Sequence, residues 1–151
     1  MHKLSLPSFD VRLQKTEDKT LIYDIIRKKY VVLTPEEWVR QHFVHYLITA
    51  LGYPKSLISV ETGMKYHDLA KRTDIIIYNR TGEPLVLVEC KSSTTNHNKK
   101  VMEQALMYNR TIKASYIILT NGLENSCIQI KSGNQSVEFL ATLPMFEDIV
   151  A

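Results

Sequence analysis

Residues 85–91, with the sequence LVLVECK, constrain the fold of this chain more than any other segment. The run begins with four apolar residues, so a strand formed here is apolar on both faces, as strands at the centre of a covered sheet are. Residues 116–120, YIILT, have the same character. The intervening residues 92–113 read as a polar loop and a helix. Strand, helix, strand in this order predicts a parallel pair joined by a right-handed crossover.

An earlier segment carries a strong helix-start signal. Thr34 suits the N-cap, Pro35 suits the first helical position, and Glu37 three residues after Thr34 completes the pattern of a capping box. The helix is expected to run to about Leu51, where Gly52 ends it. Its expected apolar stripe comprises Val39, Phe43, Tyr46, Leu47 and Ala50.

The remaining pattern predicts an α/β fold with a mixed central sheet flanked by helices. Further strands are expected at residues 57–60, 74–78, 126–131 and 137–140, with a turn at 80–83 and a second helix at 99–113. Residues 1–33 are expected to form short strands and turns, and residues 145–151 to lie loosely on the surface. A length of 151 residues predicts a single domain, with its core at about residues 34–140.

Composition narrows the class without naming a function. Hydrophobic residues make up 44% of the chain and charged residues 23%, as in ordinary globular proteins. No stretch approaches the roughly 20 apolar residues of a membrane helix, and the first residues lack a signal-peptide core. With Cys90 and Cys127 as its two cysteines, the chain is expected to be cytoplasmic. The net charge of +3 permits a nucleic-acid partner but does not predict one.

Charged residues at the end of the central strand give the first indication of chemistry. Glu89 and Lys91 are two apart, so they share one face of the strand. Asp74 opens the preceding strand, and the turn at 79–84 makes the two strands a hairpin. Pairing across that hairpin brings Asp74 near Glu89 and Lys91. Buried charges are unfavourable unless they are paired or bind a metal, so a polar site is expected here.

Two carboxylates and a lysine suit a magnesium site that acts on phosphate. Mg²⁺ takes oxygen ligands and is usually bound by one or two carboxylates together with substrate phosphates. We expect Mg²⁺, or Mn²⁺ in its place, to be held by Asp74, Glu89 and the backbone carbonyl of Cys90. Lys91 is expected to orient a water molecule or offset negative charge. Gln104 and Tyr108, four residues apart on one face of the second helix, could position the substrate or the water.

These residues resemble a known set of motifs. Asp74, followed after fourteen residues by Glu89-x-Lys91, resembles the PD-(D/E)xK nuclease motif. Gln104-x-x-x-Tyr108 resembles the QxxxY motif of type I restriction enzyme R-subunit nucleases and of nuclease domains in bacterial recombination helicases. Residues 34–54, TPEEWVRQHFVHYLITALGYP, are similar to the opening helix of the type I restriction enzyme R-protein N-terminal domain family. The resemblance covers about residues 27–139.

The resemblance implies a restriction-endonuclease-like fold and Mg²⁺-dependent cleavage of DNA. It assigns Asp74 and Glu89 as metal ligands and Lys91 as the catalytic lysine, with Gln104 and Tyr108 as the supporting pair. Glu36 resembles the acid that the family carries on its first helix, and it is expected to point inward while Glu37 serves the cap. Two departures stand out: Thr73 replaces the proline of the motif, and the helicase motor is expected to be absent because no GxxxxGK[ST] pattern occurs.

Each assignment has a structural alternative. Glu89 and Lys91 could form a surface ion pair, Tyr108 could be a core residue beside an exposed Gln104, and Glu36 could be a helix N-terminal acid favoured by the macrodipole. Glu61 could be a second acid or a solvated one. His42 and His45 are expected to be packing or surface groups rather than metal ligands. Basic residues that could contact phosphate or merely face water are Arg27, Lys28, Lys29, Lys99 and Lys100.

The sequence therefore predicts a Mg²⁺-dependent DNA endonuclease-like domain without the helicase motor. The alternative is a catalytically silent module of the same fold that binds nucleic acid or a partner. A structural sheet domain with no nucleic-acid role is a third interpretation. The expected partners are DNA and possible further subunits or a second copy of the chain, with no membrane.

Overall fold

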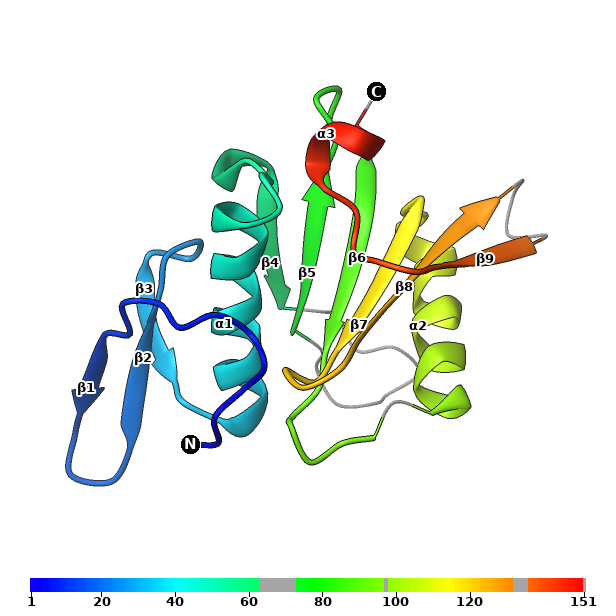
Figure 1. The fold of residues 1–151 in the computed structure, drawn as a ribbon. Coiled ribbons are helices and arrows are strands. Elements are labelled where there is room, and N and C mark those ends of the chain that lie inside the picture. The colour runs from blue at the N-terminus through cyan, green and yellow to red at the C-terminus, as the bar shows by residue number, and fades with distance from the viewer. Residues whose placement is uncertain (63–72, 97, 132–135, 151) are drawn as a thin grey trace.

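The computed structural model describes residues 1–62, 73–96, 98–131 and 136–150, with only the backbone described at 61, 62, 73 and 74 (Figure 1). Its three-stranded sheet consists of β1 (Leu13–Lys15), β2 (Thr20–Asp24) and β3 (Lys29–Val32). Its six-stranded sheet consists of β4 (Ile58–Thr62), β5 (Thr73–Tyr78), β6 (Pro84–Cys90), β7 (Tyr116–Thr120), β8 (Asn125–Lys131) and β9 (Ser136–Leu140). The helices are α1 (Pro35–Thr49), α2 (Lys99–Ile112), α3 (Phe146–Ile149) and the short 3-10 helix η1 (Lys55–Leu57).

The six-stranded sheet confirms the predicted α/β fold. Its strands lie in chain order, with β6 and β7 paired in parallel and the other described pairs antiparallel. The parallel pair is joined through α2, as the strand–helix–strand pattern predicted. All four β6 residues from Leu85 to Val88 are buried, because helices cover both faces of the sheet.

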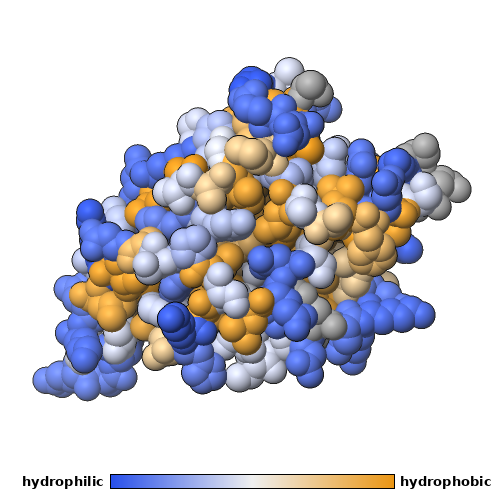
Figure 2. All heavy atoms as spheres, in the orientation of Figure 1, coloured by the Kyte–Doolittle hydropathy of each residue, from blue (hydrophilic) through white to orange (hydrophobic). Residues whose placement is uncertain are grey.

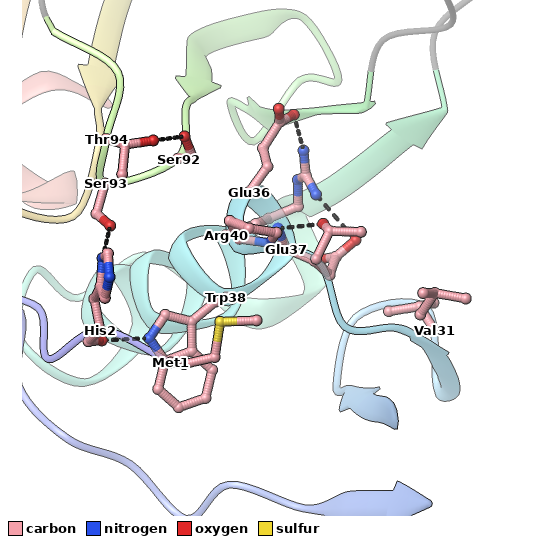
Figure 3. A pocket seen from close by; sticks show the side chains of 13 residues that line it. Met1, His2, Val31, Glu36, Glu37, Trp38, Arg40, Ser92, Ser93 and Thr94 are labelled. Carbon is pink, nitrogen blue, oxygen red and sulfur yellow. Dashed lines mark hydrogen bonds and ion pairs between the residues drawn. The ribbon is translucent and has the colours of Figure 1, made fainter. Parts of the chain in front are cut away.

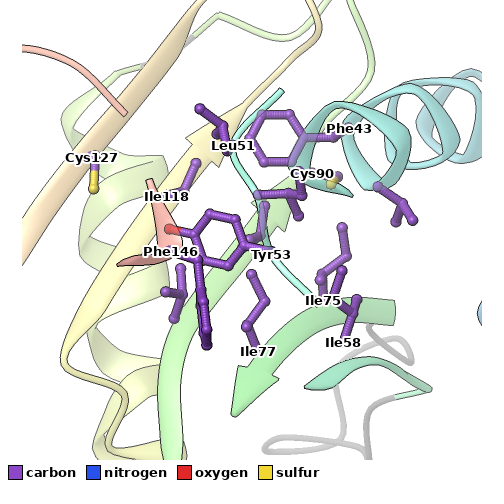
Figure 4. Packing of buried hydrophobic residues seen from close by; sticks show 14 of the residues in the cluster. Phe43, Leu51, Tyr53, Ile58, Ile75, Ile77, Cys90, Ile118, Cys127 and Phe146 are labelled. Carbon is purple, nitrogen blue, oxygen red and sulfur yellow. The ribbon is translucent and has the colours of Figure 1, made fainter. Parts of the chain in front are cut away.

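Two apolar layers flank the sheet. One face packs on α1 through Val39, Phe43 and Leu47, all fully buried (Figure 4). The opposite face packs on α2, whose Ala105 and Tyr108 contact this second cluster. Side chains alternate along β6, so Val86, Val88 and Cys90 lie on the α1 side and Leu87 lies on the α2 side.

The N-terminal residues form the predicted short strands, and the structure supplies the pairing that the sequence did not. β1, β2 and β3 make an antiparallel meander on the side of α1 away from the large sheet (Figure 1). Ile22 and Asp24 on β2 are fully buried. The carboxylate of Asp24 accepts hydrogen bonds from the backbone N–H groups of Ile26 and Arg27, and these fix the turn into β3.

The expectation that residues 145–151 lie loosely on the surface is wrong for the described residues. Phe146 on α3 is fully buried and packs edge-on against Tyr53, with 5.4 Å between ring centroids. The backbone N–H of Phe146 donates to the carbonyl of Leu51, and the Tyr53 hydroxyl donates to the carbonyl of Pro144. An aromatic side chain with backbone bonds on both sides thus closes the end of the α1 layer.

Helix α1 begins as predicted but ends two residues early, at Thr49. The Thr34 hydroxyl accepts from the Glu37 backbone N–H at 3.0 Å, which confirms the N-cap. Ala50 is the C-cap and is exposed, so the predicted apolar stripe stops at Leu47. Among the described residues, no helix combines the length and apolar character needed to cross a membrane.

Candidate active site

The predicted acidic positions follow one another across three neighbouring strands. In the β4–β5 register, Glu61 stands opposite Asp74, and in the β5–β6 register, Ile75 stands opposite Val88. Asp74 precedes Ile75 and Glu89 follows Val88, so positions 74 and 89 come together at the same edge of the sheet. The structure therefore brings three acidic positions of the chain to one end of β4, β5 and β6.

Glu89 and Lys91 lie close together at this end of the strands. Lys91 Nζ lies 3.2 Å from Glu89 Oε1, while the side chain of Glu89 is 5% exposed and that of Lys91 is 28% exposed. Strand alternation puts Glu89 on the α2 side, the same side as Leu87. The Lys91 backbone N–H donates to the carbonyl of Thr120, which extends the β6–β7 pairing by one residue. A simple surface ion pair does not describe this arrangement, because the carboxylate is buried.

Helix α2 covers the face on which Glu89 lies. Its N-cap is Asn98, whose side chain accepts from the Val101 backbone N–H. Tyr108 is 9% exposed and belongs to the core between α2 and the sheet, whereas Gln104 is exposed. The two predicted supporting residues therefore share one helix but differ in environment: Tyr108 is packed, and the amide of Gln104 reaches solvent.

The loop that follows Lys91 is held by Asn121, an asparagine that was not among the predicted site residues. Asn121 is 5% exposed, and its amide nitrogen donates to the carbonyl of Thr95 at 2.8 Å. Its carbonyl oxygen accepts from the backbone N–H groups of Leu123 and Glu124. Asn121 thus ties the loop after β6 to the turn after β7. An Asn-Gly pair directly after a buried strand was the available signal.

A pocket of about 840 Å³ lies beside the loop that follows Lys91 (Figure 3). It is lined by the start of α1, including Glu36 and Trp38, and by residues 92–94 of the loop after Lys91. The N-terminal segment closes one side: a ring nitrogen of His2 lies 2.9 Å from the Ser93 hydroxyl, and the carbonyl of His2 accepts from the Trp38 indole N–H. Glu36 and residues 92–94 therefore line the same pocket.

The orientations of Glu36 and Glu37 are the reverse of those expected. The Glu36 side chain is 46% exposed and pairs with Arg40 at 3.0 Å. Glu37 is buried, and its carboxylate accepts from Arg27 and Gln41 and pairs with Arg40 at 2.9 Å. Helical spacing puts positions 37, 40 and 41 on one side of α1, and the small sheet covers that side through Asp24 and Arg27. This network was not predicted, although the spacing of its polar residues along α1 can be read from the sequence.

The same network includes Asp24 of β2, to which Arg27 and Gln41 both donate. Burial opposes ionisation of Asp24, but hydrogen bonds and the charge of Arg27 outweigh it, and the pKa of Asp24 lies below its usual value. Burial likewise opposes the charge of Arg40, yet the negative groups around it, including Glu37 and Glu36, raise the Arg40 pKa. Both shifts favour the charged forms of Asp24 and Arg40, and the network fixes the start of α1 against the small sheet.

The other predicted residues occupy separate places. Arg27 is engaged in the network, so its guanidinium is committed to Asp24 and Glu37. Lys28 and Lys29 are exposed at the turn between β2 and β3, and Lys99 and Lys100 are exposed at the start of α2. Of these lysines, Lys99 has a distant pairing with Glu103 at 3.9 Å.

The two histidines of α1 lie in an aromatic cluster. Phe9 stacks on His45 with 4.0 Å between ring centroids and meets His42 edge-on, and Trp38 also contacts His42. Burial lowers the pKa of both histidines. The cluster supports the interpretation of His42 and His45 as packing groups.

The donor set at the sheet edge fits a hard cation. The described oxygen donors there are the Glu89 carboxylate and the Cys90 backbone carbonyl, and the backbone register brings position 74 alongside. Mg²⁺ takes oxygen ligands of this kind. Among the side chains that the structure describes, no three His, Cys, Asp or Glu residues are grouped to hold a metal. The side chains of Asp74 and Glu61 lie outside that description.

Comparison with known proteins bears on this geometry. The sequence model for the type I restriction enzyme R protein N terminus (HSDR_N) matches residues 35–144, from the first residue of α1 to the segment before α3. Searches of curated proteins and of solved structures gave no match. The match spans most of the chain and contains the whole six-stranded sheet with both large helices. The chain therefore belongs to the family of the type I restriction enzyme R protein N terminus.

Proposed function

We propose that this protein is a PD-(D/E)xK nuclease that hydrolyses phosphodiester bonds in DNA with Mg²⁺. The observation that supports this most is the buried Glu89 carboxylate beside Lys91 at the end of the central strand, next to position 74 of β5. Family membership adds that such a domain occurs in restriction enzymes that act within restriction-modification.

Asp74, Glu89 and the Cys90 carbonyl would hold the metal ion. When bound, Mg²⁺ acidifies water and stabilises negative charge on phosphate oxygens. Lys91 has its ammonium next to Glu89 and is 28% exposed, so it can also donate a hydrogen bond into the solvent-facing side of the site. There it would orient the attacking water and offset the charge that develops on the phosphate.

The surrounding residues would position the DNA. The exposed amide of Gln104 can hydrogen-bond a phosphate or the water, while the buried ring of Tyr108 sets the distance between α2 and β6. Glu36, on the pocket beside the loop after Lys91, would bind the metal through water or position the nucleophile. Lys99 and Lys100, exposed at the start of α2, would contact the backbone of the DNA.

Nicking of supercoiled plasmid with Mg²⁺ or Mn²⁺, against EDTA, tests the proposal. We expect the wild-type protein to nick, and Lys91→Ala to lower the rate by about a hundredfold or more. Asp74→Ala should abolish nicking without lowering the unfolding midpoint. Lys131→Ala is the matched control, because Lys131 pairs with Glu138 on a strand at the opposite end of the sheet. Equal rates for wild type, Asp74→Ala and Lys91→Ala would remove this site from consideration.

A protein that never nicks the plasmid but binds DNA in a separate gel-shift experiment would instead favour the silent binding module. In that case, Asp74→Ala and Lys91→Ala should bind DNA as wild type does, since these two residues would have no role in contacts with phosphate.

A further inference from the structure

The small sheet leaves one of its faces uncovered. On β2, Ile22 and Asp24 face α1 and are fully buried, so Leu21 and Tyr23 point to the opposite side. The antiparallel register sets Tyr23 opposite Tyr30 and Leu21 opposite Val32. These four residues form what we call the outer sheet face, with Arg12 beside them. Tyr30 and Val32 remain 40% and 47% exposed.

The outer sheet face combines aromatic rings with a cation. The rings of Tyr23 and Tyr30 lie edge to face, with centroids 5.2 Å apart. The guanidinium of Arg12 sits 5.5 Å above the ring of Tyr23. One ring is thus covered by a cation while its neighbour is open to solvent. Exposed aromatic rings on a sheet, interleaved with arginine, are surfaces on which unpaired bases stack.

Charge around this face favours an anionic partner. Lys28 and Lys29 are exposed at the turn adjoining Tyr30, and Arg12 is exposed beside Tyr23. Asp24, the acid next to Tyr23 on β2, points into the protein and is already neutralised by Arg27. The exposed acids Glu17 and Asp18 lie in the turn between β1 and β2, at the other end of β2 from Tyr23. Figure 2 shows hydrophobic side chains bordered by hydrophilic ones over the β1–β3 sheet at its left. The residues next to the two tyrosines therefore present positive charge to the solvent.

The face is also held in a fixed shape. Asp24 binds the backbone N–H groups of Ile26 and Arg27, and the N–H of Lys28 donates to the carbonyl of Asp24. Lys28 has a φ of 56°, which turns the chain sharply into β3. Because the backbone of this turn is already ordered, only the side chains of the lysines and Tyr30 have to become ordered on binding.

The outer sheet face continues into the pocket at the candidate site. Val32 is exposed on this face and also lines the pocket that contains Glu36 and Ser92. A strand of nucleic acid lying on Tyr30 and Val32 would be led by β3 to the start of α1. The two surfaces are therefore arranged as one path along the protein.

We propose that the outer sheet face binds an unpaired strand of DNA, with a base stacked on Tyr30 and phosphates bound by Arg12, Lys28 and Lys29. Stacking needs the open face of a base, which a paired duplex withholds, so the partner is single-stranded. The proposal rests on the proposed function only for the choice of DNA over RNA.

Fluorescence anisotropy with a labelled oligothymidylate in EDTA tests this without cleavage. Tyr30→Ala should weaken binding by about tenfold, because one base loses its stacking partner. Tyr30→Phe should bind as wild type, since the ring is kept, whereas Tyr30→Leu should bind as weakly as Tyr30→Ala. Phe139→Ala is the matched control: Phe139 is 68% exposed on β9, at the edge of the other sheet.

The salt dependence of binding and competition by other nucleic acids test the proposal further. Replacing Lys28 and Lys29 together should reduce the slope of log affinity against log salt by about 1.4, as expected for two lost phosphate contacts on a single strand. Duplex DNA should compete less well than the single strand of the same sequence, and a matching oligoribonucleotide should bind no more tightly than DNA.

Equal affinity of wild type and Tyr30→Ala, equal loss in Phe139→Ala, or tighter binding of duplex would overturn the proposal. So would a Tyr30→Leu variant that binds as wild type, which would make the face an apolar docking surface for a protein. These outcomes are separate from the nuclease test. If the protein nicks plasmid but Tyr30→Ala binds single-stranded DNA as tightly as wild type, this inference alone is refuted. If the protein binds single strands through Tyr30 but never nicks plasmid, the proposed function alone is refuted.

Discussion

Replacing Asp24 by asparagine should destabilise the protein strongly, although Asp24 is not part of the candidate site at Glu89 and Lys91. Its Oδ1 accepts from two backbone N–H groups, and its Oδ2 accepts from Arg27 Nε and from Gln41 Nε2, the latter at 3.1 Å. An asparagine can keep the first oxygen but places an amide NH₂ where the second stood. Arg27 and Gln41 then meet a donor instead of an acceptor.

The expected size follows from the burial of the group. Breaking a buried ion pair by removing one partner costs about 3–5 kcal/mol. Arg27 is 16% exposed and retains Glu37 as a partner, so we expect the lower end, about 3 kcal/mol, for Asp24→Asn. Asp24→Ala also loses the two backbone hydrogen bonds of the turn, which adds about 1–2 kcal/mol.

The contribution of Asp24 to the free energy of unfolding should decrease at acidic pH. Burial raises the Asp24 pKa, but the stronger combined effect of the Arg27 and Gln41 interactions holds it below its usual value. A group with a lowered folded pKa contributes stability above its unfolded pKa, near 3.9, and loses it as pH falls through the folded pKa. The stability difference between wild type and Asp24→Asn should therefore be full at neutral pH and shrink below about pH 4.

Urea unfolding followed by circular dichroism, repeated from neutral to acidic pH, measures both effects. Asp10→Asn is the matched control, because Asp10 is exposed. A change of less than about 0.5 kcal/mol for Asp24→Asn, the range of ordinary surface substitutions, would refute the reasoning. So would a difference that stays constant as the pH is lowered.

Further predictions follow from the core and the site. Phe146→Ala should lower the free energy of unfolding by about 3–5 kcal/mol in urea titrations, because a fully buried ring is lost. Gly122→Ala should destabilise by about 1–2 kcal/mol in the same assay, because its φ is +84° and an added Cβ would lie 2.7 Å from Leu4. Gln104→Ala should slow plasmid nicking without shifting the unfolding midpoint, since its side chain is exposed. Cys127, whose pKa is raised by burial to about 12, should resist a thiol reagent until the protein is unfolded.

The large sheet was predictable because its signals were local and consistent. The doubly apolar run that became β6 placed the centre of the sheet, and the turn before it fixed the β5–β6 pairing. The place of α3 was not predictable in the same way. Phe146 stands at helical spacing from Leu143, Ile149 and Val150, which pack in the same cluster, but this short pattern does not show where it packs. The burial of Phe146 depends on Tyr53 and Leu51, which are distant in sequence.

The residues of the candidate site were likewise predictable only in part. Strand alternation correctly put Glu89 and Lys91 together, because a period of two needs no knowledge of the rest of the fold. The choice between Glu36 and Glu37 failed, because it depended on where the small sheet packs. Only the position of Asp24 and Arg27 beside α1 makes the Glu37 side the buried one.

The rate of Mg²⁺-dependent plasmid nicking by Glu89→Gln, measured against wild type with the unfolding midpoints recorded alongside, tests the central claim most directly. The substitution keeps the shape of the side chain and removes its charge. The account predicts a rate lower by more than about a hundredfold in a variant whose midpoint shows that it is still folded under the assay conditions. Nicking at the wild-type rate by a folded Glu89→Gln would contradict it.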